Sequence, residues 1–310
     1  MINNRVEFVV VIYPVDFPQF YLLVKSIKKY HDKHYRLRVI YDDSINGIDH
    51  EAIYNKVVNL IKEELSKFEV TVECKPKHIE SSDGWITQQL LKWYLAYTST
   101  AEWQYVLDAK NFYLRPYVIP RTLIKNRAPG FKIEFETEFD QLAQKISHEF
   151  ISKHVIRPAP QKFCALTPWA WKVSEIRNML DTLWPNREWE YLQTLPGTEW
   201  FLYLSWVAGQ VEYYDRRLVD GLWNQRIDTS NLSHSVTMPF IPFGVHHRSC
   251  NMPEYIKITE TVLLSRNILK ENEIETWKDH IQDVELAYAS HLSILRNSVQ
   301  VREQELKNTI

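Results

Sequence analysis

Short apolar runs alternate with stretches of helical spacing from residue 8 to residue 108. The run FVVVIY at 8–13 is rich in β-branched residues, as in a buried strand. Stretch 53–68 instead places apolar side chains three and four apart, as in an amphipathic helix. Together the two patterns predict strands at 8–13, 37–41, 70–74 and 103–107, and helices at 20–30, 53–68 and 85–97. This alternation indicates an α/β fold with a largely parallel sheet and helices on both faces.

The pattern becomes less regular after Pro120. Here the sequence predicts a strand at 163–166, a Pro-Trp loop, a helix at 174–183 and an extended stretch at 236–247. Thr198 is a typical N-cap and should begin an apolar helix at 199–207. From about residue 255 the spacing is helical, with an apolar stripe at Ile281, Val284, Tyr288, Leu292, Leu295 and Val299. We therefore expect a domain at 1–250 and a helical C-terminal extension at 251–310.

Composition excludes several classes of function. The net charge of −2 and the lack of a long basic block argue against nucleic-acid binding. Three widely spaced cysteines, Cys74, Cys164 and Cys250, suggest neither a disulfide framework nor a zinc site, and reduced thiols fit a cytoplasmic protein. The run at 8–13 is too short for a signal peptide, and no apolar run approaches the ~18 residues of a membrane span. Only seven glycines occur, and neither GxGxxG nor GxxxxGK[ST] is present.

Polar side chains cluster on the predicted helix at 85–97. Gln88, Gln89 and Lys92 are three and four residues apart and therefore share one face, opposite Ile86 and Leu90. Two amides and an ammonium on an otherwise buried helix are costly unless they find partners. Either they form a hydrogen-bond network beside the sheet, or they contact a ligand.

Asp108 directly follows the strand predicted at 103–107. Ligands of open α/β sheets bind at the carboxyl ends of the strands, where a carboxylate can hold a divalent cation against a diphosphate. Lys110 could neutralise phosphate charge, and Asn111 could supply a neutral oxygen ligand. The alternative is a turn at the strand end built from Asp and Asn.

The pattern GW…QQLLK…YVLDAKNFYLRP, from Gly84 to Pro116, resembles the DUF6492-type glycosyltransferases of bacteria and phages. The resemblance extends from the first strand to about residue 250. It implies a GT-A-like fold and a hexosyltransferase-like enzyme (EC 2.4) that uses a nucleotide sugar, UDP- or GDP-linked, and a glycan or other hydroxyl acceptor. It also implies a possible divalent metal ion, Mn or Mg.

The resemblance also suggests individual roles. Asp108 occupies the place of the first carboxylate of a DxD motif, and Lys110 replaces the second, which puts metal dependence in question. Glu199 would act on the acceptor as a general base or an anchor, although an acid in the first turn of a helix also interacts with the dipole. His246 and His247 resemble the late histidine that binds metal or diphosphate. In a strand, one of them would point inwards and the other outwards.

Two further loops leave the predicted strands at the same sheet edge. Tyr13 and Asp16 follow the first strand, and Asp42 and Asp43 follow the second. In the resembled fold these loops hold the nucleobase and the ribose, and a carboxylate can accept hydrogen bonds from either. Taken singly, each of the four residues is better explained as an ordinary turn residue.

Two alternative functions stay open. A nucleotidyltransferase could use a similar sheet, although a Gly-rich phosphate loop is lacking after the first strand. A non-catalytic glycan- or nucleotide-binding protein could keep a degenerate GT-A fold, and Lys110 in place of a carboxylate favours that alternative.

Overall fold

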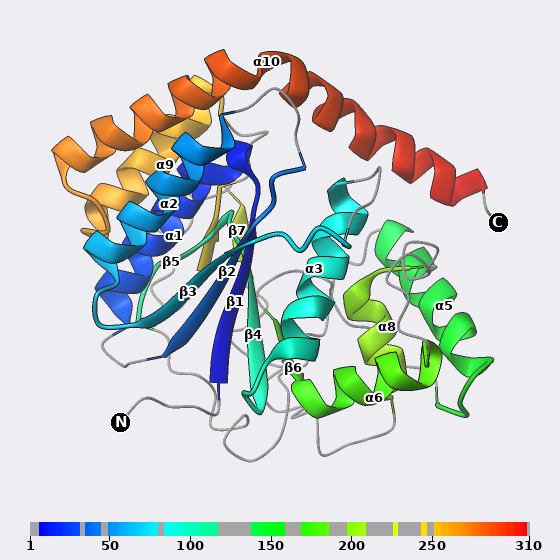
Figure 1. Cartoon of the computed structure of the whole chain (residues 1–310). Helices are drawn as coiled ribbons and strands as arrows, with labels where there is room; N and C mark the ends of the chain where they lie inside the picture. The colour runs from blue at the N-terminus through cyan, green and yellow to red at the C-terminus, as the bar shows by residue number, and fades with distance from the viewer. Residues whose placement is uncertain are drawn as a thin grey trace.

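We describe the protein from a computed structural model of the whole chain (Figure 1). The structure describes residues 6–31, 35–44, 49–79, 84–116, 138–158, 169–185, 197–208, 226–228, 243–246 and 251–308. The strand predicted at 163–166 and most of the extended stretch at 236–247 lie outside these residues.

The first part of the chain follows the predicted order of strands and helices. Its elements are β1 (Val6–Ile12), η1 (Pro14–Asp16), α1 (Phe17–Tyr30), β2 (Arg36–Tyr41), α2 (His50–Glu64), β3 (Glu69–Cys74), α3 (Gly84–Thr98), β4 (Trp103–Asp108) and β5 (Asn111–Tyr113). The remaining elements are α5 (Glu138–Ser152), β6 (Trp169–Lys172), α6 (Val173–Leu183), α8 (Glu199–Trp206), β7 (Arg226–Asp228), β8 (Phe243–Val245), α9 (Pro253–Ser265) and α10 (Glu271–Asn308).

The central sheet has the strand order β3-β2-β1-β4-β6. The first four of these strands are parallel, and β6 pairs antiparallel with β4 at the edge. A smaller sheet, β5-β8-β7, begins directly after β4. The predicted class, a mostly parallel sheet flanked by helices, is therefore confirmed.

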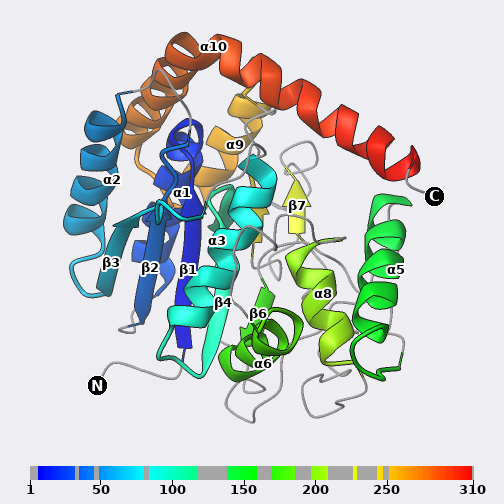
Figure 2. The ribbon, with the colours of Figure 1, turned by 45° about the vertical axis from the view of Figure 1, so that its right-hand side comes forward.

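The alternation along β1 explains why the molecule has a core on each side of this sheet. Phe8, Val10 and Ile12 pack into a cluster with α1, α2, α9 and α10. Val9 and Val11 face the other way, into a cluster with α3, α5, α6 and α8. Figures 1 and 2 show the two groups of helices on opposite sides of the sheet. Because both faces are covered, every residue of β1 is buried.

The C-terminal helices pack onto the same core as α1. Leu263 of α9 and Trp277 of α10 are completely buried in it. The backbone of Tyr288 is non-helical, and there α10 bends before continuing across the molecule toward α5 (Figure 1). The predicted helical character of the tail is confirmed, and Ile281, Val284 and Tyr288 of its stripe are buried.

Two local predictions were wrong. The segment between the strand predicted at 8–13 and the helix predicted at 20–30 is not a loop, since Pro14 begins η1 and Pro18 occupies the first turn of α1. Proline is tolerated there because the first amide groups of a helix have no partner within the helix. The stretch after Pro168 is not a loop either. It forms β6, which buries Trp169 and Trp171 by pairing with β4.

Candidate functional site

The predicted site residues converge at the carboxyl edge of the parallel strands. Because β1 lies between β2 and β4, its end is next to the ends of both. The register pairs Ile12 with Tyr41 and Val11 with Asp108. The loops that carry Tyr13, Asp42 and Lys110 therefore leave the sheet side by side, at the edge where ligands bind in open α/β sheets.

A tight turn positions the carboxylate of Asp108. The side-chain oxygen of Asn111 accepts a hydrogen bond of 2.8 Å from the backbone N–H of Asp108. Asn111 is completely buried and starts β5, so the chain passes directly from the central sheet to the smaller one. This oxygen of Asn111 thus has the turn role that we considered as the alternative to ligand binding.

Lys92 connects Asp108 to Glu199. Its Nζ atom lies 3.1 Å from Oδ1 of Asp108 and 3.0 Å from Oε1 of Glu199. The ammonium also lies 4.9 Å from the ring centroid of Trp169. Burial by itself would lower the pKa of Lys92, but the carboxylates of Asp108 and Glu199 outweigh it and raise the pKa above its usual value. Lys92 is therefore charged, although only 4% of the residue is exposed.

The start of α8 holds Glu199 in place. Gly197 has a φ of 92°, and a Cβ atom there would lie 1.9 Å from Oγ of Ser147, so only glycine fits. Thr198 caps the helix as predicted, by accepting from the N–H of Phe201. The N–H of Glu199 donates to Oε1 of Gln89 at 2.9 Å. Two residues of the polar face predicted on α3 thus hold Glu199: Gln89 contacts its backbone and Lys92 its side chain. The third residue of this face, Gln88, is only partly buried.

Lys110 adds a second ammonium on the other side of Asp108. Its Nζ atom lies 3.1 Å from Oδ2 of Asp108, and its side chain is 30% exposed. Both oxygens of Asp108 therefore contact lysine. Two lysines and two carboxylates form this cluster, which we call the charge cluster: Lys92, Asp108, Lys110 and Glu199.

In the loops after β1 and β2, Tyr13 and Asp42 are buried, whereas Asp16 and Asp43 are more exposed. The Tyr13 hydroxyl donates to the carbonyl of Gly84 at the start of α3. Burial raises the pKa of Asp42, against the opposing effect of hydrogen bonds from Ser44 and Tyr13. Asp42 is completely buried, whereas the side chain of Asp43 is 45% exposed and lies 4.0 Å from Lys75. Asp16 ends η1 and is partly buried.

His246 does not have the contacts expected of a metal or diphosphate ligand. The ring is completely buried, with Nδ1 at 3.0 Å from the Thr259 hydroxyl and Nε2 at 3.0 Å from Oδ1 of Asn251. It also packs edge-on against Trp277. These contacts occupy both ring nitrogens, because α9 and α10 cover the segment after β8. His247 lies outside the described residues.

The described residues do not fit the divalent metal ion suggested by the sequence. Hard cations such as Mg²⁺ need several oxygen ligands that are free to coordinate. Each oxygen of Asp108, and Oε1 of Glu199, is already within about 3 Å of an ammonium. Within the described ranges, no three His, Cys, Asp or Glu side chains come together as metal ligands.

Tryptophan rings pack beside the charge cluster. Trp169 stacks on Trp200 with ring centroids 5.1 Å apart, and Trp200 lies 5.7 Å from Tyr203. Trp169 and Trp200 are both buried, so these rings form core. We missed the contact of Trp169 with Lys92 because we assigned residue 169 to a loop. The signal that could have revealed it is the alternation in the sequence WAWK.

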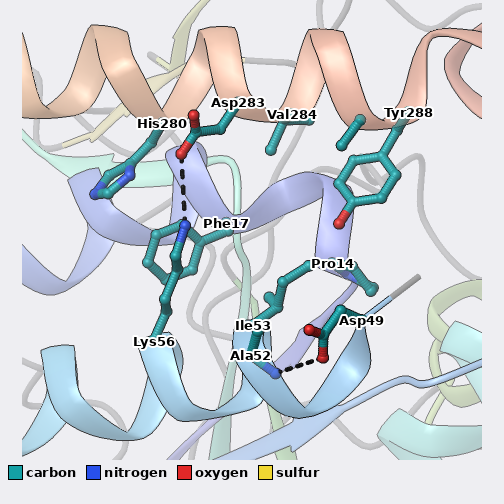
Figure 3. A pocket seen from close by; sticks show the side chains of 11 residues that line it. Pro14, Phe17, Asp49, Ala52, Ile53, Lys56, His280, Asp283, Val284 and Tyr288 are labelled. Atoms are coloured by element: carbon teal, nitrogen blue, oxygen red, sulfur yellow. Dashed lines mark hydrogen bonds and ion pairs between the residues drawn. The ribbon is translucent and has the colours of Figure 1, made fainter.

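A separate cavity of about 320 Å³ lies between α2, α10 and the start of α1 (Figure 3). Its polar groups are used locally. Lys56 lies 3.4 Å from Asp283, and Asp49 caps α2 by accepting from the N–H of Ala52. None of the predicted site residues lines this cavity. Its lining consists of Pro14, Phe17, Asp49, Ala52, Ile53, Lys56, His280, Asp283, Val284, Ala287 and Tyr288.

Comparison with known proteins gives similarity in structure only. No protein-family model matches the chain, and no curated protein is similar to it in sequence. An active-site mutant of LgtC is 14% identical, with a TM-score of 0.49 over 86% of this chain and 98% of that one. The galactosyltransferase LgtC with donor and acceptor sugar analogs is 13% identical, with a TM-score of 0.49 over 88% and 99% of the two chains.

The bifunctional glycosyltransferase WbbM is a third similar structure. It is 12% identical, with a TM-score of 0.47 over 89% of this chain and 52% of that one. These values concern the fold and carry no conclusion about substrate or mechanism. The predicted α/β class agrees with the sheet described above. No helix among the described residues is long and apolar enough to cross a membrane.

Proposed function

We propose that the chain is a glycosyltransferase that moves a sugar from a nucleoside diphosphate to an acceptor hydroxyl. The charge cluster at the carboxyl edge of the parallel sheet is the observation that carries this proposal. Taking charges out of water is costly, and a buried ion pair adds little stability over apolar packing. A buried cluster at a ligand-binding edge is therefore better explained by a function in binding or catalysis.

The donor nucleotide would bind over the loops that leave β1 and β2. Of the four predicted residues, Asp16 and Asp43 are the more exposed, and their carboxylates can accept hydrogen bonds from a base N–H or a ribose hydroxyl. Tyr13 and Asp42 are buried. The diphosphate would then lie beside Lys110, the more exposed lysine of the charge cluster. The donors that we propose to test are UDP- and GDP-linked sugars.

The reaction needs one bond to break and one to form at the anomeric carbon. The bond from this carbon to the diphosphate oxygen breaks, and the electron pair stays on that oxygen. The acceptor oxygen bonds to the carbon and gives up its proton. Glu199 is the proposed proton acceptor, because Oε2 has no hydrogen-bond partner among the described residues. The ammonium of Lys110 stabilises the charge that develops on the diphosphate.

Nucleotide binding followed by turnover tests this proposal. We expect UDP or GDP to raise the melting temperature, because a ligand that binds only the folded state stabilises it. The matching nucleotide sugar should then be hydrolysed slowly without an acceptor. Asp108→Ala should abolish hydrolysis and still melt cooperatively. Unchanged hydrolysis in this variant would remove Asp108 from the site.

A non-catalytic binding protein is the second candidate function. The observation in its favour is that lysines hold both oxygens of Asp108. A protein of this kind would bind a nucleotide or glycan but show no hydrolysis with any nucleotide sugar. Membership of the DUF6492-type family, hexosyl transfer and a cytoplasmic location belong to the first proposal, and they rest on the sequence.

A further inference from the structure

The charges around Asp108 point to a catalytic cation that belongs to the protein itself. We propose that sugar transfer at this site needs no divalent metal ion, because the Lys110 ammonium takes the place beside the diphosphate that a metal ion would occupy. This inference rests on the proposed function, and it assigns separate tasks to the two lysines of the charge cluster.

The carboxylates are already neutralised by ammonium groups. Asp108 has one at 3.1 Å from each oxygen, and Glu199 shares the ammonium of Lys92 at 3.0 Å. A divalent cation bound to Asp108 would come close to two like charges in a largely buried site, where repulsion is strong. Binding a metal ion would therefore require at least one lysine to leave.

The neighbouring groups that could complete a metal site have other partners. The side-chain oxygen of Asn111 accepts from the backbone of Asp108. Both ring nitrogens of His246 contact Thr259 or Asn251. The charge of Asp108 is thus already neutralised, and the other expected metal ligands, Asn111 and His246, make hydrogen bonds within the protein.

The two lysines differ in their access to a ligand. The side chain of Lys92 is only 5% exposed and is shared between two carboxylates and the face of Trp169. It is suited to hold Asp108 and Glu199 in place. The side chain of Lys110 is 30% exposed and, among the described residues, pairs with Asp108 alone, so it can exchange a carboxylate oxygen for a phosphate oxygen.

The step is balanced without a metal ion. When the bond from the anomeric carbon to the diphosphate breaks, the electron pair remains on the phosphate oxygen. Lys110 donates a hydrogen bond to this oxygen and keeps its proton. The acceptor's proton passes to Glu199, so the transfer consumes no further reactant.

Calorimetry with UDP and GDP, in excess EDTA or in MnCl₂, tests the inference on the full chain. We expect the Kd values of the bound nucleotide in the two buffers to agree within about threefold, a small difference in binding free energy. Binding only in manganese would overturn the inference and leave the proposed glycosyltransferase intact. Binding of neither nucleotide in either buffer would overturn both. Sugar release from the matching donor should likewise be unchanged by EDTA.

Replacing Lys110 by a carboxylate should reverse the metal response. In Lys110→Asp, two carboxylates replace one carboxylate and one ammonium, which favours a hard cation. We expect its nucleotide affinity to fall by at least about tenfold in EDTA and to recover in manganese. Lys110→Met should lose affinity in both buffers. Affinity in EDTA that is unchanged in both variants would overturn the assignment of Lys110.

Lys145→Asp is the matched control for the change of charge. Lys145 is exposed on α5 and forms no ion pair among the described residues. The nucleotide affinity of the Lys145→Asp variant in EDTA should therefore equal that of the unaltered chain. Melting curves of all variants separate a loss of binding from a loss of folding, because Lys110 is partly exposed and its replacement should leave the fold intact.

Discussion

Lys25 and Lys92 each bridge two carboxylates, but their surroundings are very different. Lys25 of α1 lies 2.7 Å from Glu64 of α2 and 2.6 Å from Glu273 of α10. Lys92 of α3 lies about as close to Asp108 at the end of β4 and to Glu199 of α8. The first bridge joins three helices on one face of the sheet, and the second is on the other face, at the strand ends.

The partners of the two lysines are not equally accessible. Glu273 is 25% exposed, and Glu64 has a second partner in Lys28. Glu199 is only 5% exposed and Asp108 only 12%. The Lys25 bridge can therefore act as a clamp between helices, whereas the charged groups of the Lys92 bridge are almost completely shielded from solvent. The same chemical motif thus has different uses, which depend on where the fold places it.

The largest effect should come from removing the buried bridge. Lys92→Met leaves Asp108 and Glu199 buried without their shared cation, and breaking a buried pair in this way costs about 3–5 kcal/mol of unfolding free energy. Urea denaturation measures this cost. A loss below ~1 kcal/mol would mean that water reaches the two carboxylates and that the cluster is not the buried unit we describe.

Replacing the proposed base should lower the rate of turnover. Glu199→Gln keeps the size of the side chain but removes the proton acceptor, so we expect turnover to fall by about 10²–10⁴-fold. Nucleotide affinity should be nearly unchanged, because Glu199 is proposed to act on the acceptor. Steady-state kinetics and calorimetry measure the two quantities. Weaker nucleotide binding at unchanged turnover would instead place Glu199 on the donor side.

The same Lys→Met change in the helical clamp should cost less. In Lys25→Met, Glu64 keeps Lys28 and water reaches Glu273, so we expect a loss of about 1.5–3 kcal/mol, as for hydrogen bonds to charged groups. Turnover should not change, because the clamp does not contribute to the charge cluster. A cost equal to that of Lys92→Met would remove the contrast between the two bridges.

The smallest effect concerns acid pH. Burial by itself would raise the pKa of Glu64 and Glu273, but hydrogen bonds from their lysine partners outweigh it and lower both values. A lowered pKa in the folded state contributes stability above the ordinary glutamate pKa, and this stability is lost as pH falls through the lowered value. Denaturation between about pH 5 and about pH 3 should show this loss, and Lys25→Met should reduce its slope.

Hydrophobic spacing alone predicted most of the central sheet and its helices. The strands at β1, β2, β3 and β4 have continuous or alternating apolar residues, and helices α2 and α3 have clear amphipathic stripes. These patterns arise from burial against a sheet and need no knowledge of distant contacts. Polar residues at predicted strand ends, such as Asp108, could also be singled out, because parallel strands bring their carboxyl ends to one edge.

Only the tertiary structure decided how the singled-out residues combine. Lys92 and Glu199 are 107 positions apart, and local sequence does not specify which charges will pair over that distance. The residues of β6 became a strand by pairing with β4, and His246 became a core residue because α9 and α10 cover it. Local propensity determined most of the elements, whereas long-range packing determined which polar groups were buried together and what they contact.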